Sequence, residues 1–494
     1  MHGESEYTFA WGGGVDGIEQ LDVPMHKTHD LIILGSGSTA FAAAIRAASY
    51  GVRVLMCEKS VLGGTCINWG CIPSKTMIHA ALFKHEAHLG RKIGINGDDT
   101  NHTLDTESFF RHREAVVTGL RQERYLDILK SMDGLELVKG TARFIDSHVV
   151  ECAGRRYSSE RYLIAVGGAP RVLDIPGLEK CPYYTSRTAL LAKKLPASLV
   201  ILGGGVIAVE LGQMYQRLGC RVTIIEHGPR ILPSIEPELS SSIQDILEQE
   251  GINVVTNATI CFLDRAGGVT VVSADIGGLR HEFSCDIFLI AVGTVPATSD
   301  IGIESTGVTL DAKGFIITDT QMRSTKDGIW AAGDVVGKMM IATVGAKEGI
   351  VAVDDMFNRG CGCAMNYLEI PMAIFTDPEV AMVGHTEESA RLAGYDCVTN
   401  CMPVSAIAKA HVTGMTSGVF KMIADRVTGR MLGVHLVCHR GAEIINEAAL
   451  ALHMRATIAD VASTSHVYPS IGEGLKLCAQ GFSRDISRLS CCAE

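Results

Sequence analysis

Two cysteine pairs have spacings that allow redox or metal chemistry. Cys66 and Cys71 lie in LGGTCINWGCIPSK with four residues between them. A helix over this segment would place both sulfurs near one face, within reach of a disulfide, and a helix start would stabilise a thiolate. We therefore predict a redox-active pair. Half of a zinc site is the alternative, but no second Cys or His pair follows at a suitable distance.

The second pair, Cys491 and Cys492, is adjacent in the terminal sequence SCCAE. Neighbouring Cα atoms lie ~3.8 Å apart, whereas an unstrained disulfide needs ~5.5–6 Å, so these residues make a poor structural bridge. As free thiolates they suit a soft metal ion, and Hg(II), which favours two nearly linear sulfur ligands, is an extreme case. An incidental pair is the alternative. The C-x-C pair Cys361 and Cys363 is assigned no role.

The elements that must position these sulfurs are indicated by a pattern that occurs twice. DLIILGSGSTAFAAAIRAASYGVRVLMCEKS and SLVILGGGVIAVELGQMYQRLGCRVTIIEHG each contain an apolar run, Gly-x-Gly-x-x-Ala, an amphipathic segment, a second apolar run and a Glu. The repeated positions are Gly35, Gly37, Ala40 and Glu58 in the first copy, and Gly203, Gly205, Ala208 and Glu226 in the second.

Each copy predicts a strand, turn, helix and strand that bind a dinucleotide. The glycines let the backbone approach the pyrophosphate, the helix start offers unpaired N–H groups, and the acid accepts ribose hydroxyls. Tight strand-to-helix packing alone would not explain the two acids. Two sites in one chain predict two dinucleotides, FAD and a nicotinamide nucleotide.

Further glycine-containing segments fit the same plan. In TKDGIWAAGDVVG, Gly333 and Asp334 follow a short apolar run, where the acid could bind a hydroxyl of the cofactor. YLIAVGGAP and IFLIAVGTVPAT are typical of strand ends that turn at glycine and are predicted to mark crossings between the two nucleotide domains. Ordinary strand-to-loop turns are the alternative for each of these segments.

Length and composition exclude several classes of protein. At 494 residues, the chain exceeds the ~100–200 residues of a typical domain, so we expect two to four units. A net charge of −11 argues against nucleic acid as a partner, and the longest apolar stretch is interrupted by Gly35, Gly37 and Arg46, which argues against a membrane span. Residues 1–28 contain acidic residues and no apolar signal region, so we expect a cytoplasmic protein.

The motif GGTCINWGCIPSK, together with the two glycine motifs, resembles the flavin-dependent pyridine nucleotide–disulfide oxidoreductases from about residue 29 to the C-terminus. The resemblance implies an α/β fold with two Rossmann-like dinucleotide-binding domains and an α+β C-terminal dimerisation domain, in a head-to-tail homodimer. The expected divisions are an extension over 1–28, FAD-binding segments over 29–169 and 293–364, an NAD(P)-binding domain over 170–292, and a dimerisation domain over 365–494 that includes the Cys-Cys tail.

The resemblance also implies roles for individual residues. Electrons would pass from NADPH or NADH through FAD to a Cys66–Cys71 disulfide, with Cys71 as the flavin-facing thiolate and Cys66 as the interchange thiol. Lys75 would lie near the flavin and pair with Glu210. The cofactor-binding residues would also include Gly64, Thr65 and Lys75.

The sequence departs from the disulfide-reducing members of the family near its C-terminus. Those members carry a His-Pro pattern followed by Glu, in which the histidine shuttles a proton to the interchange thiol. In SHVYPSIGEGLKL, Pro469 and Glu473 keep the spacing, but Tyr468 occupies the base position. A phenol with a pKa near ~10 is a poor base at neutral pH. We do not expect His466 to replace it.

Loss of the base with retention of both cysteines favours a substrate that needs thiolates but no proton shuttle, such as a soft metal ion. The chain resembles the mercury-reducing members of the family in this change and in its terminal cysteine pair. It also resembles them in a second tyrosine, Tyr125, for which a plain position on an amphipathic helix is an equal alternative. We therefore expect reduction of Hg(II) to Hg(0), with Cys66, Cys71, Cys491 and Cys492 as mercury ligands shared between subunits.

Some features are left open by the sequence. Residues 1–28 contain no cysteine, so we expect the N-terminal metal-binding domain of many such enzymes to be absent. Glu226 favours NADH over NADPH, although His227 and Arg230 could tolerate a 2′-phosphate. The alternative functions are a dihydrolipoamide dehydrogenase-like disulfide reductase and a metal-sequestering redox sensor.

Overall fold

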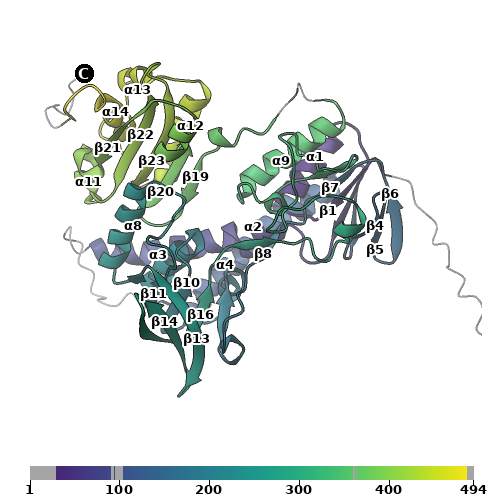
Figure 1. Ribbon diagram of the computed structural model, residues 1–494, viewed down its shortest axis with the longest axis horizontal. Helices are drawn as coiled ribbons and strands as arrows, with labels where there is room; N and C mark the ends of the chain where they lie inside the picture. Colours follow the sequence, from purple (N-terminus) through teal and green to yellow (C-terminus); the bar gives the residue numbers. More distant parts are fainter. Residues whose placement is uncertain (1–28, 91–93, 95–103, 360–361, 363, 487–494) are drawn as a thin grey trace, which may run out of the picture.

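The structure, a computed structural model, describes residues 29–90, 94, 104–359, 362 and 364–486. The extension 1–28, the pair Cys361 and Cys363, and the pair Cys491 and Cys492 lie outside the described residues. Figure 1 shows three groups of elements: one around β1 and α1, one around β10 and β16, and one built from β19 to β23 with their helices.

The first group is built on a parallel sheet of five strands, as predicted from the first glycine motif. Their order is β18 (Ile329–Ala331), β7 (Tyr162–Ile164), β1 (Leu31–Leu34), β2 (Val54–Glu58) and β3 (Leu135–Lys139). Strands β1 and β2 are continuous apolar runs because both faces of the sheet are covered. Helices α1 (Ser38–Ala48) and α9 (Ala342–Met356) contribute to the core on one face.

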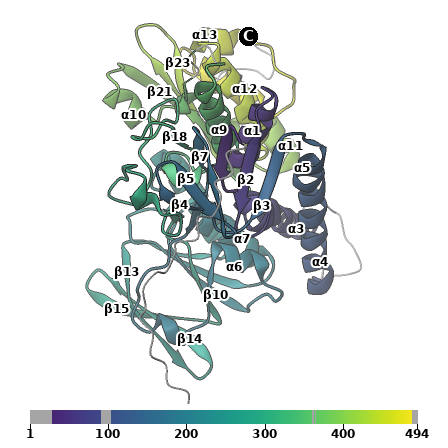
Figure 2. The same ribbon diagram turned by 90° about the vertical axis from the view of Figure 1, so that its right-hand side faces the viewer.

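The opposite face of this sheet is covered by a small antiparallel sheet. It consists of β4 (Arg143–Asp146), β5 (Val149–Cys152) and β6 (Arg155–Ser158). One apolar cluster joins the two sheets and includes Leu55, Phe144 and Val150. Figures 1 and 2 both show the small sheet beside the parallel one.

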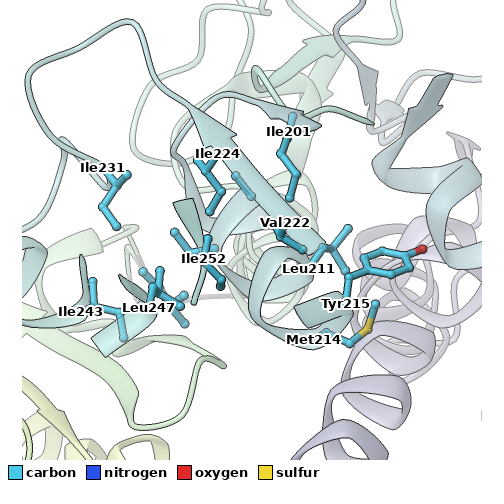
Figure 3. Close-up of a cluster of buried hydrophobic side chains, with 14 of the residues drawn as sticks. Ile201, Leu211, Met214, Tyr215, Val222, Ile224, Ile231, Ile243, Leu247 and Ile252 are labelled. Carbon is cyan, nitrogen blue, oxygen red and sulfur yellow. The ribbon is translucent and has the colours of Figure 1, made fainter. Parts of the chain in front are cut away.

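The second group is also built on a five-stranded parallel sheet. The order is β12 (Asn253–Val255), β11 (Arg221–Ile225), β10 (Ser198–Leu202), β16 (Ile287–Ile290) and β9 (Tyr183–Thr185), with helices α6 (Ser186–Leu191), α7 (Val206–Arg217) and α8 (Pro237–Gln249). Figure 3 shows part of its core, a buried apolar cluster that includes Ile201 and Val222 of the strands and Leu211 and Tyr215 of α7.

Two smaller antiparallel sheets complete this part of the chain. One contains β13 (Ala258–Ala266), β14 (Val269–Ile276) and β15 (Leu279–Cys285), and the other pairs β8 (Gly168–Pro170) with β17 (Thr294–Pro296). Strands β8 and β17 follow β7 and β16 along the chain, so the two expected crossing segments run side by side. The division between the nucleotide domains near residues 170 and 292 stays a prediction.

The third group is an antiparallel sheet covered by helices. The strand order is β19 (Met372–Ile374), β20 (Glu379–Gly384), β23 (Met431–Cys438), β22 (Val419–Asp425) and β21 (Cys397–Pro403). The helices are α10 (Glu387–Leu392), α11 (Ala408–Thr413), α12 (Gly441–His453), α13 (Ile458–Ser463) and α14 (Glu473–Gln480). All of β23 is buried, which places this strand in the centre of the unit.

The remaining elements connect these groups. Helices α2 (Gly64–Trp69), α3 (Cys71–Leu89), α4 (Thr106–Arg121), η2 (Gln122–Leu126) and α5 (Asp127–Ser131) follow β2, and short 3₁₀ turns occur at η3 (Leu178–Lys180), η4 (Ile303–Ser305), η5 (Asp334–Val336), η6 (Tyr367–Glu369) and η7 (Val404–Ala406). Among the described residues, no helix combines the length and apolar character needed to cross a membrane. The mixed α/β architecture confirms the expected fold class.

Candidate active site

The Cys66 and Cys71 thiols lie at the junction of two helices and not on the single helix that their spacing allowed. Cys66 lies in α2, whereas Cys71 is the first residue of α3. Gly70 breaks the helix with φ −127° and ψ −118°. A β-carbon on Gly70 would lie 2.9 Å from the carbonyl oxygen of Thr65, which explains why glycine fits this junction. The break places Cys71 at the start of a 19-residue helix, where the dipole favours a thiolate.

The two sulfurs interact directly as free thiols. A hydrogen bond from the Cys66 thiol, assisted by the positive charge of Lys75, lowers the pKa of Cys71 to about 7. The same contact, together with burial, raises the pKa of Cys66 well above its ordinary value. The pair therefore consists of a thiolate, Cys71, and a protonated neighbour, Cys66, near neutral pH.

This asymmetry predicts a pH dependence that can be measured on the reduced protein without metal. Because only the thiolate is nucleophilic, alkylation of Cys71 by iodoacetamide should rise with pH through a midpoint near 7. In a Cys66→Ser variant the thiol donor is replaced by a hydroxyl of different geometry, so the midpoint should move toward the ordinary thiol value of roughly 8.5. The midpoints are measured by mass spectrometry of alkylated peptides, and identical midpoints in both proteins would contradict the assignment.

Lys75 is held beside the cysteines by an ion pair. Its Nζ lies 2.7 Å from Glu210 Oε2 on α7, the pair that the family pattern implies. The same ammonium lies 4.6 Å from the centroid of the Phe375 ring, and the Phe375 N–H donates to Glu210 Oε1 at 2.9 Å. These contacts join α3, α7 and the segment after β19, so residues from the second and third groups fix a lysine on a connecting helix.

Tyr125 lies close to the cysteine pair. Burial raises its pKa to about 12, and the charges of Cys66 and Cys71 add to this effect. Its ring makes an edge contact with Phe41, with centroids 4.7 Å apart, and closely approaches Gly63. It lies in η2, a π-helical segment of a kind that often occurs at functional sites. The structure therefore places Tyr125 against the turn before α2 and within electrostatic range of both cysteines, a placement that sequence spacing alone left undecided.

Tyr468 and His466 lie in the loop before α14. Tyr468 is 45% exposed in the single chain. The side chain of His466 is only 7% exposed, and its Nε2 lies 2.8 Å from Glu447 Oε1. Burial raises the pKa of Glu473, while Lys476 and His466 lower it. The expectation that His466 does not replace the missing base stays a prediction.

The first glycine motif forms the kind of cradle that a dinucleotide needs. Gly35 has φ +113°, and a β-carbon there would lie 2.3 Å from Ala165 O. A β-carbon on Gly64 would lie 2.7 Å from the Cα of Gly37, so two backbone segments meet over the start of α1. Ala40 packs at 0% exposure in α1, and Thr65 is exposed in the first turn of α2.

Two acids border this cradle. The Glu58 carboxylate accepts hydrogen bonds from Ser36 Oγ and the Ser60 N–H. Burial raises the pKa of Asp334, which follows Gly333. Burial of a carboxylate is unfavourable unless it accepts hydrogen bonds. Asp334 therefore suits a ligand that carries hydroxyl groups. The cradle and the acids therefore fit FAD, with Gly35, Gly37, Gly64, Glu58 and Asp334 as the residues that would hold it.

The second glycine motif repeats the backbone geometry of the first. Gly203 has φ +103°, and a β-carbon there would lie 2.5 Å from Ala291 O. Gly205 caps α7 as Gly37 caps α1, with φ −78° against −74°. Ala208 is fully buried. The Glu226 carboxylate accepts the N–H groups of Gly204 and Gly228, so the acid lies against the glycine turn.

Several side chains that support the site were not identified from the sequence. Asn68, between the two cysteines, is buried and donates to the carbonyls of Leu62 and Gly64 at 3.0 and 2.8 Å, which fixes the turn before α2. Glu348 is fully buried, with its carboxylate accepting from Gly333 N–H and the Tyr367 hydroxyl. The position of Asn68 inside the cysteine motif was an available signal, whereas nothing local identifies Glu348.

Comparisons with known proteins agree with this architecture. A family model described as pyridine nucleotide-disulphide oxidoreductase matches residues 29–349, and its dimerisation domain matches residues 370–479. A mercuric reductase of Lysinibacillus sphaericus is 36% identical over 97% of this chain and 87% of the relative. A dihydrolipoyl dehydrogenase of Thermus scotoductus is 35% identical over 93% of this chain and 98% of the relative.

A solved structure has the same fold. The Cu(II) complex of the HOCl-induced flavoprotein disulfide reductase RclA from Escherichia coli has a TM-score of 0.82 and 29% identity, covering 93% of this chain and 100% of that one. The cofactors are FAD and NAD(P)H, and the matched dimerisation domain supports a homodimer. From its two nucleotide-binding units, its cysteine pair and these matches, the chain belongs to the pyridine nucleotide-disulphide oxidoreductase family.

Proposed function

We propose that this protein reduces mercuric ion with NAD(P)H, in the balanced reaction Hg(II) + NAD(P)H → Hg(0) + NAD(P)⁺ + H⁺. The proposal is supported by the contacting thiols of Cys66 and Cys71 and by mercuric reductases that are 34–36% identical to this chain over at least 93% of it. Soft thiolates select soft ions, and two sulfurs suffice for Hg(II).

One observation favours a metal ion over a disulfide substrate. Disulfide reduction requires an acid that protonates the leaving thiolate. The family position for that acid carries Tyr468, and the nearby His466 Nε2 lies 2.8 Å from Glu447 Oε1. Hg(II) binding releases protons from thiols and needs no such donor.

The residues of the chain would act on the metal in a defined order. Cys71, already a thiolate near neutral pH, binds Hg(II) first. Cys66 follows and releases its proton as its sulfur bonds to the metal. Bound FAD would accept two electrons from the nicotinamide and pass them toward this thiol pair. The Lys75 and Glu210 ion pair keeps a positive charge beside Cys71 throughout.

The tyrosines and the terminal cysteines would complete the site. The charges of both cysteines act on Tyr125, and its neutral phenol would donate a hydrogen bond to a sulfur ligand of the bound metal. We propose that Tyr468, Cys491 and Cys492 reach the site from the partner subunit. Delivery by Cys491 and Cys492 would let the metal move from small thiols to Cys66 and Cys71 by ligand exchange.

Turnover separates this function from its rivals. Holoenzyme is supplied with NADH or NADPH and with HgCl₂ in excess glutathione, and both nucleotide oxidation and loss of volatile mercury are followed. Mercury-dependent oxidation with one Hg(0) released per nucleotide supports the proposal. Stoichiometric binding without turnover would instead indicate metal sequestration. Efficient reduction of lipoamide without mercury reduction would indicate a dihydrolipoyl dehydrogenase-like enzyme, the activity of another relative at 35% identity.

The tail assignment has its own test. The Cys491→Ala/Cys492→Ala double variant should reduce mercury presented as a glutathione complex roughly tenfold or more slowly, because delivery by a tethered ligand becomes a reaction in solution. Reduction of a small dye by NADH should not change. Cys361→Ala/Cys363→Ala is the matched control, since it also removes two thiols that lie close to each other in the sequence. Equal mercury turnover in both double variants would exclude a role for the tail.

The environment of Glu226 supports a preference for NADH. Its carboxylate lies at the glycine turn, where it would repel a 2′-phosphate and can accept from a 2′-hydroxyl. The two nearby basic side chains have other partners. The Arg230 guanidinium donates to the carbonyls of Leu232, Pro233 and Ile235, and His227 Nδ1 lies 3.0 Å from Thr259 Oγ1.

We therefore expect kcat/KM for NADH to exceed that for NADPH by roughly tenfold or more, since one charge pair at this position is worth about 1–2 kcal/mol. Glu226→Gln removes the repulsive charge but keeps an acceptor, so the ratio should fall mainly through better use of NADPH. The two kcat/KM values are measured at constant ionic strength. A wild-type preference for NADPH would contradict the assignment.

A further inference from the structure

A second pair of thiols lies outside the active site. Cys57 is in β2, directly before Glu58, and Cys152 is the last residue of β5. Their exposures are 2% and 1%. Both belong to the apolar cluster between the parallel sheet and the small sheet of β4 to β6 (Figure 2). The proposed reaction uses neither residue.

Contacts around these residues bring the two sulfurs together. The Cys57 thiol hydrogen-bonds with the Cys152 sulfur. On the same side, the Gly140 N–H donates to the Glu58 carbonyl at 2.9 Å, and a β-carbon on Gly140 would lie only 3.2 Å from the Cys152 sulfur. Three chain segments therefore converge here, around two sulfurs in hydrogen-bond contact.

The exposed turn at the end of β5 is the nearest surface to this pair along the chain. Cys152 is followed by the exposed turn Ala153 and Gly154, in which Ala153 has φ +51°. A left-handed conformation is unfavourable for alanine, so this hairpin end stores local strain. Short surface hairpins open at a lower free energy than the core strands they join, so transient opening here would expose Cys152 before Cys57.

We propose that Cys57 and Cys152 form a second, reversible disulfide when the protein is exposed to a peroxide. The Cys152 thiolate attacks one oxygen of the peroxide and becomes a sulfenic acid, releasing hydroxide. The Cys57 sulfur then displaces the sulfenic oxygen as water and gives up its own proton. For hydrogen peroxide, two thiols and one H₂O₂ yield one disulfide and two molecules of water.

The electrostatics of the pair agree with this order. The hydrogen bond from Cys57 lowers the pKa of Cys152, whereas the same contact and burial raise the pKa of Cys57. Cys152 is thus the attacking thiol and Cys57 the resolving thiol. The bond would covalently join β2 to β5, and hence the parallel sheet to the small sheet.

Tryptic peptides make the test direct. Cys57 lies in the peptide 54–59, Cys152 in 144–155, and the active-site pair together in 60–75. Holoenzyme is treated with hydrogen peroxide, alkylated, digested without reductant and analysed by mass spectrometry. We expect a cross-linked species of peptides 54–59 and 144–155 that disappears after dithiothreitol. Cys438 is the matched control, since it is 0% exposed and no thiol is among the groups that shift its pKa.

Two variants distinguish the roles of the thiols. In Cys57→Ser, Cys152 should accumulate as sulfenic acid and react with dimedone, because the resolving thiol is gone. In Cys152→Ser, Cys57 should stay reduced, like Cys438. Dimedone labelling of Cys152 in Cys57→Ser, together with reduced Cys57 in Cys152→Ser, supports the proposal. The proposal fails if wild-type Cys57 and Cys152 both remain as reduced as Cys438 after peroxide, or if dimedone labels Cys57 but not Cys152.

Discussion

Replacing Cys71 by serine is expected to lower mercury-dependent oxidation of NAD(P)H by roughly 10³-fold or more. Serine keeps the size of the side chain but replaces a sulfur whose pKa is about 7 with a hydroxyl that stays neutral and binds soft ions poorly. Cys66 alone cannot form a two-sulfur site. The measurement is the initial rate of volatile mercury formation with saturating nucleotide.

A matched control separates this effect from general loss of a thiol. Cys261→Ser alters a partly exposed cysteine in β13, outside the active site, and should leave the rate unchanged. Binding of Hg(II) to the C-terminal thiols should persist in Cys71→Ser, so titration of the metal would still find a site without turnover. If Cys71→Ser retained more than a tenth of wild-type turnover, the thiol would not be the ligand from which Hg(II) is reduced.

Replacing Lys421 by methionine is expected to lower the free energy of unfolding of the C-terminal unit by about 3–5 kcal/mol. The Lys421 side chain is 2% exposed, and its ammonium lies 2.8 Å from Glu236, 2.8 Å from Glu238 and 3.0 Å from Glu387. Methionine fills a similar volume but leaves the carboxylates without their cation. Because Glu236 and Glu238 begin α8 while Lys421 lies in β22, the change should also loosen the contact between these units.

Hydrogen exchange of β22 and β23 amides measures this effect locally, without assuming that the whole chain unfolds in one step. Lys313→Met is the control because Lys313 is exposed in a turn, and it should leave exchange unchanged. Adding Glu236→Gln to Lys421→Met should restore part of the loss, since one buried charge is removed. Equal protection in Lys421→Met and the wild type would show that the cluster contributes little to stability.

The fold class was predictable because its signals are local. Gly35 and Gly203 have positive φ values and leave no room for a β-carbon beside the end of a neighbouring strand, and an apolar run precedes each glycine turn. These requirements are written in a few consecutive residues, so both dinucleotide units could be identified from the sequence. The Cys66 and Cys71 motif was predictable for the same reason, although the break at Gly70 was not. The catalytic roles assigned to the site residues remain predictions.

The sequence by itself determined which residues can do chemistry: two thiols, a lysine, a glutamate and two glycine turns. Only the tertiary structure decided their environment. It placed Tyr125 beside the cysteines, paired His466 with Glu447, enclosed Lys421 among three carboxylates, and brought Cys57 to Cys152 across 95 residues. The reason is physical. Backbone conformation is constrained mainly by neighbours in the chain, whereas burial and pKa depend on whichever residues pack nearby, and these come from distant segments.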